Sequence, residues 1–283
     1  MNINMKSNVT VIIPCYNDGR YIVQALQSIF NQTVLPEKII IVDDGSNAET
    51  QKVLASIQHS LVQVFYQENQ GVSVARNNAI TLAQTDFIVN LDADDFYEPT
   101  FIEKAAAVLL TNEAIGAVGC FYKTLENNIL NTVIVKPSGG AIKHFLVKNS
   151  SLGTCMYRKK CWEQAGGFDE KMIDGYEDWE FWISVLKQDW TMHIIEEPLF
   201  VYRVKNTSRD RSALVNHDFE LRKYIYTKHK EVYEEYREFY ILELLRQNSM
   251  FRNTAYKIKR DVDYRIGYNL LKPLRFLKKV FSR

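Results

Sequence analysis

Cysteines are few in this sequence, and their spacing excludes the common cysteine-based architectures. The four, Cys15, Cys120, Cys155 and Cys161, form neither a Cys-x-x-Cys pair nor a dense framework. A structural zinc site and a disulfide-stabilised scaffold are therefore not indicated. Thiols without such a framework fit a reducing cytosol, which is the location we expect.

Long apolar runs, repeats and catalytic triads are missing as well. No stretch approaches the roughly 18 consecutive apolar residues of a membrane span, and no signal-peptide core precedes the first strand-like run. The five histidines are scattered, and none lies in a recognisable triad context with cysteine or serine. We therefore expect a chain that does not cross a membrane, and we assign no catalytic role to histidine.

The chain has enough apolar material for one large folded unit. Its 283 residues are 46% hydrophobic and 24% charged, a composition typical of soluble globular proteins. Residues 251–283 hold ten Lys or Arg and two Asp, a net +8, which leaves −7 on the preceding residues. An acidic body argues against nucleic acid as a partner, whereas a basic end favours an anionic surface such as a membrane leaflet.

Short β-branched runs alternate with helix-period segments over the first 120 residues, which is the pattern of βαβ units around a mainly parallel sheet. The expected strands are Val9–Pro14, Lys38–Asp43, Val62–Tyr66 and Asp86–Leu91. The expected helices are Ile22–Phe30 with a cap at Asn17 or Asp18, Glu49–His59 and Val72–Ala83. The sequence thus predicts an α/β fold.

The alternation loosens after Phe121. Strands are expected at Thr132–Lys136 and Thr154–Arg158, with turns at Gly139-Gly140 and Gly166-Gly167. An amphipathic helix follows Glu177, two strand-like runs lead to Val204, and helices follow from about Ala213. The apolar face of the helix after Glu177 consists of Trp179, Trp182, Ile183 and Leu186.

Polar residues concentrate where three of the expected strands end. These ends are Pro14-Cys15-Tyr16-Asn17, Asp43-Asp44-Gly45-Ser46 and Asp92-Ala93-Asp94-Asp95. In an open parallel sheet, ligands bind beyond the carboxyl ends of the strands. The three segments therefore predict one binding rim.

The acidic segment Asp92–Asp95 allows two interpretations. Asp92 and Asp94 lie two residues apart on an extended segment, so they could share a hard cation such as Mg²⁺ or Mn²⁺. These ions bind through one or two carboxylates, with water and substrate phosphate completing the coordination. Alternatively, Asp94 and Asp95 form an ordinary turn and cap the helix expected after Pro99.

The remaining rim residues also allow two interpretations each. Asp44 could accept hydrogen bonds from a nucleobase or ribose, or Asp43–Ser46 could be a turn that caps the next helix. The Tyr16 ring could stack on a base or fill the rim. Arg76 opposes the dipole of the helix that it opens, which predicts an anionic partner: a rim aspartate, or an aspartate together with a nucleotide.

Glu177-Asp178 begins the later amphipathic helix. Capping is one interpretation, with Glu177 and Glu180 loosely resembling a capping box. In the other, Asp178 is a general base that takes the proton from an acceptor hydroxyl as this attacks an anomeric carbon. A helix N-terminus lowers the pKa of a carboxyl group, so this role needs a compensating apolar or acidic neighbourhood, which Trp179 and Glu177 could supply.

These motifs, in this order, resemble the family 2 glycosyltransferases. The match covers about Val9–Ser208, and accident does not explain six motifs in one order. They are Val11–Asn17, Asp43–Ser46, Asn69–Gly71 with Ala75–Asn77, Leu91–Asp95, Gly166–Asp169 and Tyr176–Trp179.

The resemblance implies a GT-A fold, in which a Rossmann-like, mostly parallel sheet with flanking helices occupies residues 1–210. Residues 1–120 would bind the nucleotide and 121–210 the acceptor, and 211–283 would form a helical extension with a basic amphipathic end. The implied reaction is inverting transfer of a sugar from a nucleoside-diphosphate sugar, foremost a UDP-sugar, by direct displacement. The acceptor would be a hydroxyl of a saccharide or lipid-linked acceptor in bacterial surface-polysaccharide synthesis.

The resemblance also implies roles for individual residues. Asp178 would be the base, and Asp94, with Asp92, would hold the Mn²⁺ or Mg²⁺ that stabilises the departing diphosphate. Glu177 and Trp179 adjoin the base. The nucleotide-binding positions would be Pro14, Tyr16, Asn17, Asp44, Arg76, Asp92 and Ala93. Many relatives have histidine where Lys205 follows Tyr202-Arg203-Val204, and a lysine there could pair with phosphate directly and weaken the metal dependence.

The tail beyond Tyr256 lies outside these motifs. Its composition is that of an interfacial helix, which could bind the inner face of the cytoplasmic membrane, or pack as a basic helix on its own domain. The apolar residues are Leu270, Leu271, Leu274, Leu277 and Phe281, and they interleave with Lys272, Arg275, Lys278 and Lys279.

Two other functions are compatible with parts of the sequence. A sugar nucleotidyltransferase would release pyrophosphate, but no Gly-rich triphosphate loop bearing Lys or Arg follows the first strand. A non-catalytic binding or scaffold relative would be expected to lose acidic rim residues, yet Asp44, Asp92, Asp94 and Asp178 all remain. We therefore favour the enzyme.

Overall fold

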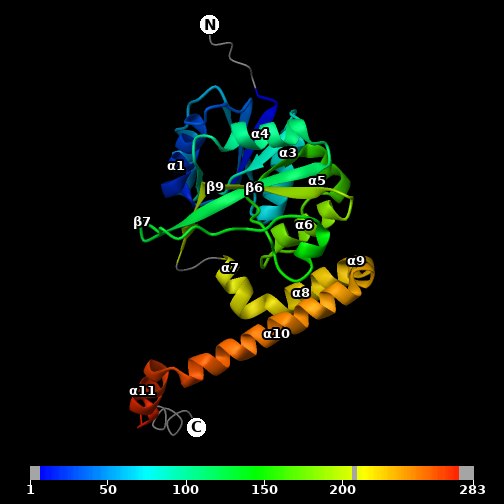
Figure 1. The fold of residues 1–283 in the computed structure, drawn as a ribbon. Helices are drawn as coiled ribbons and strands as arrows, with labels where there is room; N and C mark the ends of the chain where they lie inside the picture. The colour runs from blue at the N-terminus through cyan, green and yellow to red at the C-terminus, as the bar shows by residue number, and fades with distance from the viewer. Residues whose placement is uncertain (1–6, 206–208, 274–283) are drawn as a thin grey trace. The chain divides into compact units, whose positions relative to one another are not determined.

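The strands of the computed structural model, which describes residues 7–205 and 209–273, form one mixed sheet. They are β1 (Val9–Cys15), β2 (Lys38–Asp44), β3 (Val62–Gln67), β4 (Phe87–Asn90), β5 (Phe96–Tyr97), β6 (Ile115–Glu126), β7 (Ile129–Leu130), β8 (Met156–Arg158) and β9 (Thr191–Val204). Within the described residues the order is β3-β2-β1-β4-β8-β6-β9-β5, with β7 paired to β6 (Figure 1).

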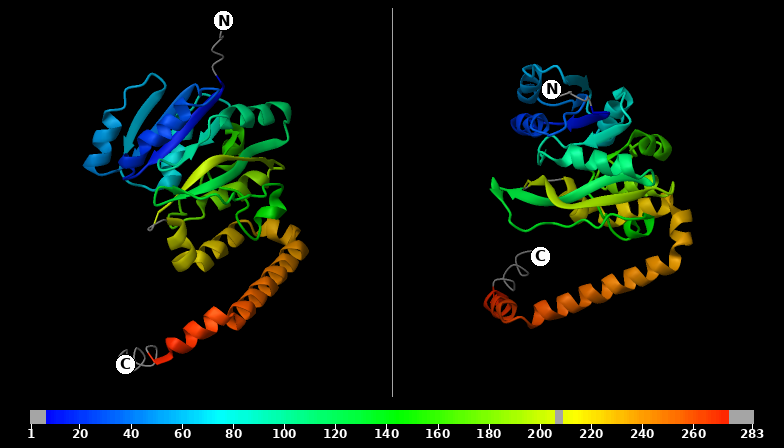
Figure 2. Two further views of the ribbon diagram at one scale, coloured as in Figure 1. Left: turned by 60° about the vertical axis from the view of Figure 1, so that its left-hand side comes forward. Right: turned by 45° about the horizontal axis from the view of Figure 1, so that its top comes forward.

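The direction of the strands divides the sheet into two parts. β3, β2, β1 and β4 are parallel, as predicted for a Rossmann-like half. β8 runs antiparallel to both β4 and β6, and β5 runs antiparallel to β9, whereas the long strands β6 and β9 pair in parallel (Figure 2). The predicted α/β fold with flanking helices is confirmed, and the sheet is mixed beyond β4.

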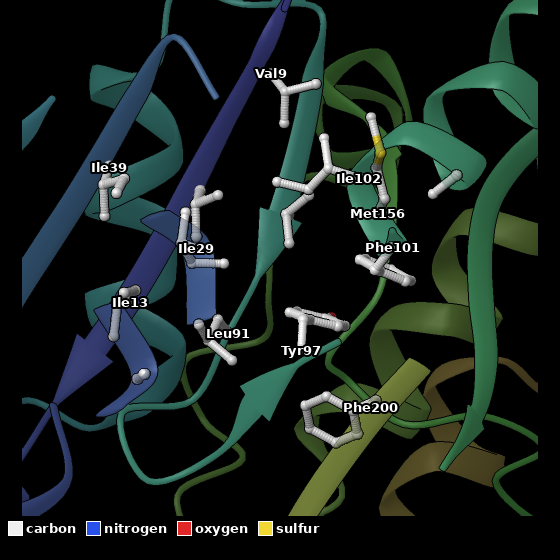
Figure 3. Packing of buried hydrophobic residues seen from close by; sticks show 14 of the residues in the cluster. Val9, Ile13, Ile29, Ile39, Leu91, Tyr97, Phe101, Ile102, Met156 and Phe200 are labelled. Carbon is white, nitrogen blue, oxygen red and sulfur yellow. The ribbon is translucent and has the colours of Figure 1, made fainter. Parts of the chain in front are cut away.

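Several helices flank the sheet and build the core with their apolar faces, whereas the last two helices of the described chain bury none of their residues. The helices are α1 (Gly19–Phe30), α2 (Ala48–Ala55), α3 (Val72–Leu82), α4 (Phe101–Thr111), η1 (Ile142–Phe145), α5 (Lys159–Ala165), α6 (Glu177–Leu186), α7 (Arg209–Ser212), η2 (Ala213–His217), α8 (Asp218–Lys228), α9 (Lys230–Glu235), α10 (Arg237–Arg260) and α11 (Val262–Leu270). Ile29 of α1 and Phe101 of α4 pack with Ile13 of β1 and Phe200 of β9 in one cluster (Figure 3). This cluster holds the sheet rigid beneath the rim.

Residues 115–140 differ from the prediction. Strand β6 was not predicted from the sequence, because Gly116 and Gly119 lower the strand propensity of this segment. A Cβ atom on Gly116 would lie 2.8 Å from the Cys161 sulfur, so close packing requires glycine there. The predicted strand Thr132–Lys136 is wrong, because Val135 alone pairs with Tyr122 and the neighbouring side chains are exposed. The two expected runs before Val204 are the single strand β9.

The chain divides into two compact units between Glu234 and Glu235, later than the expected boundary at residue 210. The segment 211–234 belongs to the first unit because Ile225 and His229 are fully buried and Tyr233 donates a hydrogen bond to the Leu146 carbonyl. The second unit contains α10 and α11, which supports the predicted helical extension. Among the described residues no helix is both long and apolar enough to cross a bilayer. Of the tail, residues 274–283 lie outside the described residues.

Candidate active site

A pocket of about 450 Å³ lies at the carboxyl ends of β1, β2 and β4, where the sequence predicts a rim. We call it the rim pocket. Its lining includes the predicted residues Pro14, Tyr16, Asp44, Asp92, Ala93, Asp94 and Lys205. The Tyr16 side chain is 52% exposed, so its ring is not a buried filler of the rim. Asn17 and Arg76 do not line this pocket.

Asp44 anchors the loop that leads into α3. Its Oδ1 accepts hydrogen bonds from the Gln67 side-chain amide and the Gln70 N–H, both at 2.8 Å. Its Oδ2 accepts from the Gly71 N–H at 2.9 Å. Both carboxylate oxygens therefore shape the pocket wall. The hypothesis that Asp43–Ser46 caps α2 is wrong, because the Asn47 side chain caps it through the Thr50 N–H.

Asn17 holds two loops of the rim together. Its N–H donates to the Ser46 hydroxyl at 2.9 Å, and its side-chain oxygen accepts from the Asn47 N–H at 2.7 Å. Its backbone has a φ of 59°, a region that asparagine tolerates better than most residues. The structure therefore gives Asn17 a positioning role behind the rim.

The carboxylates of the acidic segment have different partners. Asp92 Oδ1 pairs with Arg76 at 2.7 Å, and Asp94 Oδ2 pairs with Lys205 at 2.7 Å. Asp95 is buried, and its Oδ1 accepts from the Arg203 N–H at 2.7 Å. The Asp95 N–H bonds the Asp92 carbonyl, which confirms a turn. The predicted cap is wrong, because Thr100 precedes α4 and no side chain caps this helix.

Burial and crowding set the pKa values of these carboxyl groups. Burial opposes ionisation of Asp92, but Arg76 outweighs it and lowers the pKa of that group. Burial raises the pKa of Asp94 even though Lys205 opposes the shift. The pKa of Asp95 is raised well above its usual range by burial and by its neighbours Asp94 and Asp92. Arg76 thus favours the ionised form of Asp92, whereas burial makes Asp94 and Asp95 easier to protonate than free carboxyl groups.

The residues suit a divalent metal that the substrate helps to hold. Among the described residues no three His, Cys, Asp or Glu side chains are grouped to enclose a metal ion. Mg²⁺ and Mn²⁺ often bind through one or two carboxylates and take their other ligands from water and phosphate. Asp94 lines the rim pocket with a side chain that is 17% exposed, so it can serve as such an anchor.

Arg76 connects the rim with α6. It is buried, at 2% exposure, and its Nη1 lies 2.9 Å from Glu177 Oε1, opposite its bond to Asp92. The predicted anionic partner is confirmed, because Arg76 pairs with the rim residue Asp92, and a nucleotide as a further partner stays a prediction. Arg76 lies in the second turn of α3, which begins at Val72, so its predicted place in the first turn is wrong. Glu177 also pairs with Arg209, at 2.5 Å, which places α7 against the same carboxylate.

A second pocket of about 450 Å³ contains Asp178, and we call it the Asp178 pocket. Asp178 Oδ2 accepts a hydrogen bond from the Asn149 side-chain amide at 2.8 Å, and Oδ1 accepts from the Trp179 N–H. Trp179 lines the same pocket and is buried. Glu177 lines neither pocket, because it faces Arg76.

The capping hypothesis for α6 is wrong. Tyr176 is the N-cap residue, no side chain caps the helix, and its backbone has a φ of 59°. Glu180 does not reach back to the N-terminus but bonds His229, Lys228 and Ser184. A tyrosine in this left-handed region is strained and persists only where its surroundings fix it. Here its hydroxyl donates to Asp218 at 2.7 Å, which fixes the start of α6 beside Asp178.

Several lining residues were not identified from the sequence. They include Asp18, Arg203 and Arg209 in the rim pocket, and Lys136, Lys148, Asn149 and Arg222 in the Asp178 pocket. Asp18 and Asp94 both pair with Lys205 at 2.7 Å. Of these residues, Arg203 could most easily have been found from the sequence, because it belongs to the Tyr-Arg pair that precedes Lys205.

The comparisons with known proteins agree with this arrangement. The model of glycosyl transferase family 2 matches residues 10–160, from β1 through β8. TuaG of Bacillus subtilis (strain 168), a glycosyltransferase ascribed to teichuronic acid biosynthesis, is 31% identical over 209 residues, 72% of this chain and 82% of TuaG. The chain belongs to glycosyl transferase family 2.

Other relatives of this glycosyltransferase are longer than it is. The hyaluronan synthase of Pasteurella multocida is 26% identical over 93% of this chain, which spans 29% of the synthase. Among solved structures, residues 1–349 of S. aureus TarS in complex with UDP-GlcNAc superpose with a TM-score of 0.62 at 21% identity. That superposition covers 74% of this chain and 61% of the TarS chain, and it supports the GT-A fold.

Proposed function

We propose that this glycosyltransferase moves a sugar from a nucleoside-diphosphate sugar, foremost a UDP-sugar, to a hydroxyl of a saccharide or lipid-linked acceptor in bacterial surface-polysaccharide synthesis. The observation that carries the proposal is a pair of pockets, with Arg76 bonded to Asp92 of the first and to Glu177, the residue before Asp178 of the second. One pocket offers Tyr16 and the acidic rim to a nucleotide, and the other offers Asp178 to an acceptor. The TarS structures named for UDP and UDP-GlcNAc support the choice of donor.

Asp178 is the general base in this proposal. It takes the proton from the acceptor hydroxyl, whose oxygen then bonds to the anomeric carbon from the face opposite the diphosphate. The bond between that carbon and the diphosphate oxygen breaks, and the electron pair leaves with the nucleoside diphosphate. One displacement with no covalent intermediate inverts the anomeric configuration. Trp179 and the short bond from Asn149 orient the Asp178 carboxylate.

The rim stabilises the leaving group. Asp94, with Asp92 as a second ligand, would hold the Mn²⁺ or Mg²⁺ that neutralises the diphosphate. Lys205 and Arg209 line the same pocket and can contact phosphate oxygens directly. The hydrogen bonds of Asp44 and Asn17 keep the pocket wall beside Tyr16 in place, so that the nucleobase of the donor can bind there.

A donor-binding titration tests the nucleotide assignment. We expect calorimetry to detect UDP-sugar binding that is tighter with Mn²⁺ or Mg²⁺ than with chelator. A panel of UDP-, GDP-, CDP- and dTDP-sugars identifies the nucleobase that the donor pocket prefers. Turnover that releases pyrophosphate from a nucleoside triphosphate would instead establish a nucleotidyltransferase.

We further propose that the C-terminal unit binds an anionic membrane surface. On α10 and α11, large apolar side chains such as Phe251, Ile258 and Ile266 are exposed beside Arg252 and Lys259. This mixture is typical of interfacial helices. Co-sedimentation with anionic vesicles but not with zwitterionic ones is expected, and equal behaviour with both would contradict the proposal.

A further inference from the structure

The charge of the Asp178 pocket is opposite to that of the body around it. The residues before 251 sum to −7, yet among the described residues the lining of this pocket contains the cations Lys136, Lys148 and Arg222 against one carboxylate, that of Asp178. A neutral sugar needs no such excess of positive charge. An excess of one sign in a pocket raises the local concentration of ligands of the other sign.

Lys148 and Arg222 line the Asp178 pocket close to the proposed general base, Asp178. Lys148 adjoins Asn149, whose side-chain amide bonds Asp178. Arg222 donates to the Val147 carbonyl at 2.9 Å, and its guanidinium lies 4.9 Å from the centre of the Trp179 ring. The two cations therefore flank Asp178 through its immediate neighbours, where they can offset its repulsion of an anionic acceptor.

Lys136 comes from the neighbouring loop. The N–H groups of Ser138 and Gly139 both donate to the Ser150 carbonyl, which joins the Lys136 loop to the Lys148 segment. Both lysine side chains are exposed, and neither has an ion-pair partner in residues 7–205 and 209–273. Lys136 Nζ lies 5.5 Å from the centre of the Phe121 ring, a contact that leaves its charge without a counterion. Arg222, in contrast, pairs with Asp218 at 2.8 Å. The two lysines are thus the charges available to a ligand.

We propose that the acceptor carries an anionic group, a carboxylate or a phosphate, close to the hydroxyl that receives the sugar, and that Lys136 and Lys148 bind this group. The inference rests on the proposed function, because it assumes that the Asp178 pocket holds the acceptor. An ammonium group binds either anion as a point charge without a fixed geometry. The acceptor class is therefore a uronic acid-containing saccharide or a phosphate-bearing one.

Acceptor binding can be measured without turnover, so failure of the inference is distinct from failure of the transferase assignment. By calorimetry at low salt, we compare a glucuronate-terminated tetrasaccharide with the same tetrasaccharide ending in glucose. A saccharide phosphate and its unphosphorylated form give the second pair. We expect at least one charged probe to bind about tenfold more tightly than its neutral partner, and the pair that responds identifies the anion.

The variants assign the effect to the two lysines. Lys136→Gln with Lys148→Gln should abolish the preference, whereas Lys136→Arg with Lys148→Arg should keep it and Lys143→Gln, an exposed lysine that does not line the pocket, should leave it unchanged. UDP-sugar affinity should stay constant in all of them. Equal binding of charged and neutral probes, no binding of either charged probe, or a preference that survives the double Gln variant would overturn the inference.

Discussion

The guanidinium of Arg76 and the carboxylate of Glu177 lie 2.9 Å apart although 101 residues separate them in the chain. Because Arg76 also bonds Asp92, one buried side chain joins the acidic rim to the first turn of the helix that carries Asp178. Arg76 also lies near Asp178, whose charge adds to those of Asp92 and Glu177 in raising the pKa of the guanidinium against the effect of burial. The two pockets therefore share one structural support.

Replacing Arg76 should destabilise the first unit strongly. Arg76→Ala leaves Asp92 and Glu177 without their shared buried cation, and breaking such a pair costs about 3–5 kcal/mol. Urea unfolding measures the loss. If Arg76→Ala fails to fold, Arg76→Lys, which cannot bridge both carboxylates, should still lower the midpoint. Lys104→Ala, which removes the exposed pair with Glu197, serves as the control and should cost less than about 1 kcal/mol. An Arg76 variant as stable as the control would refute this role.

Asp178→Asn should separate binding from chemistry. The amide keeps the size of the side chain but cannot accept the hydroxyl proton, so kcat should fall by about 10²–10⁴-fold. The dissociation constant of the UDP-sugar should not change, because Asp178 does not line the rim pocket. Product release and calorimetry on the same preparation give the two values. A variant with nearly full turnover would show that another group is the base.

Asp94→Ala should remove the metal dependence of donor binding. Without this carboxylate the metal loses its protein anchor, so Mn²⁺ should no longer tighten UDP-sugar binding. Titrations with metal and with chelator test this. Asp86→Ala, at the opposite end of β4 and bonded to Asn8, is the matched control. Donor affinity with metal that is unchanged in Asp94→Ala would contradict the assignment of this ligand.

Acid should destabilise the junction between α6 and α8. Burial opposes ionisation of Glu180, but hydrogen bonds from His229, Lys228 and Ser184 outweigh it and lower its pKa below the ordinary 4.5. A carboxyl group with a lowered pKa in the folded state contributes stability above about pH 4.5, and this contribution is lost as the pH falls through the lowered value.

Unfolding free energies measured between pH 7 and pH 3 test that sign. The pH dependence should flatten in Glu180→Gln, which has no proton to gain there, and should persist in Glu113→Gln, an exposed carboxylate. An identical slope in wild type and Glu180→Gln would show that this carboxyl group does not control the acid transition.

The rim could be predicted from the sequence because one rule of parallel sheets places its residues. The segments after β1, β2 and β4 must meet at one edge, whatever the details of the loops. Tyr16, Asp44 and Asp94 were found this way. Their individual partners could not be predicted, because the bond from Asp94 to Lys205 depends on β9 returning beside β5 more than one hundred residues later.

Strand β6 and the site residues Arg209 and Arg222 could not be predicted either, because they too depend on contacts between residues far apart in the chain. β6 contains two glycines that lower its apparent strand propensity, and they are needed only because Cys161, Trp190 and Ile194 pack against the strand. Arg209 and Arg222 belong to helices after the family motifs, so no pattern linked them to Glu177 or Trp179. The position of Arg222 follows from the burial of Ile225 and His229, which holds α8 against the rest of the first unit.

The measurement that tests the central claim most directly is acceptor-dependent release of nucleoside diphosphate, with the new glycosidic linkage assigned by NMR. We expect UDP and a saccharide product in equal amounts, with the anomeric configuration opposite to that of the donor, from the wild type but not from Asp178→Asn. Retention of configuration, or no release of nucleoside diphosphate across the donor and acceptor panel, would contradict the account.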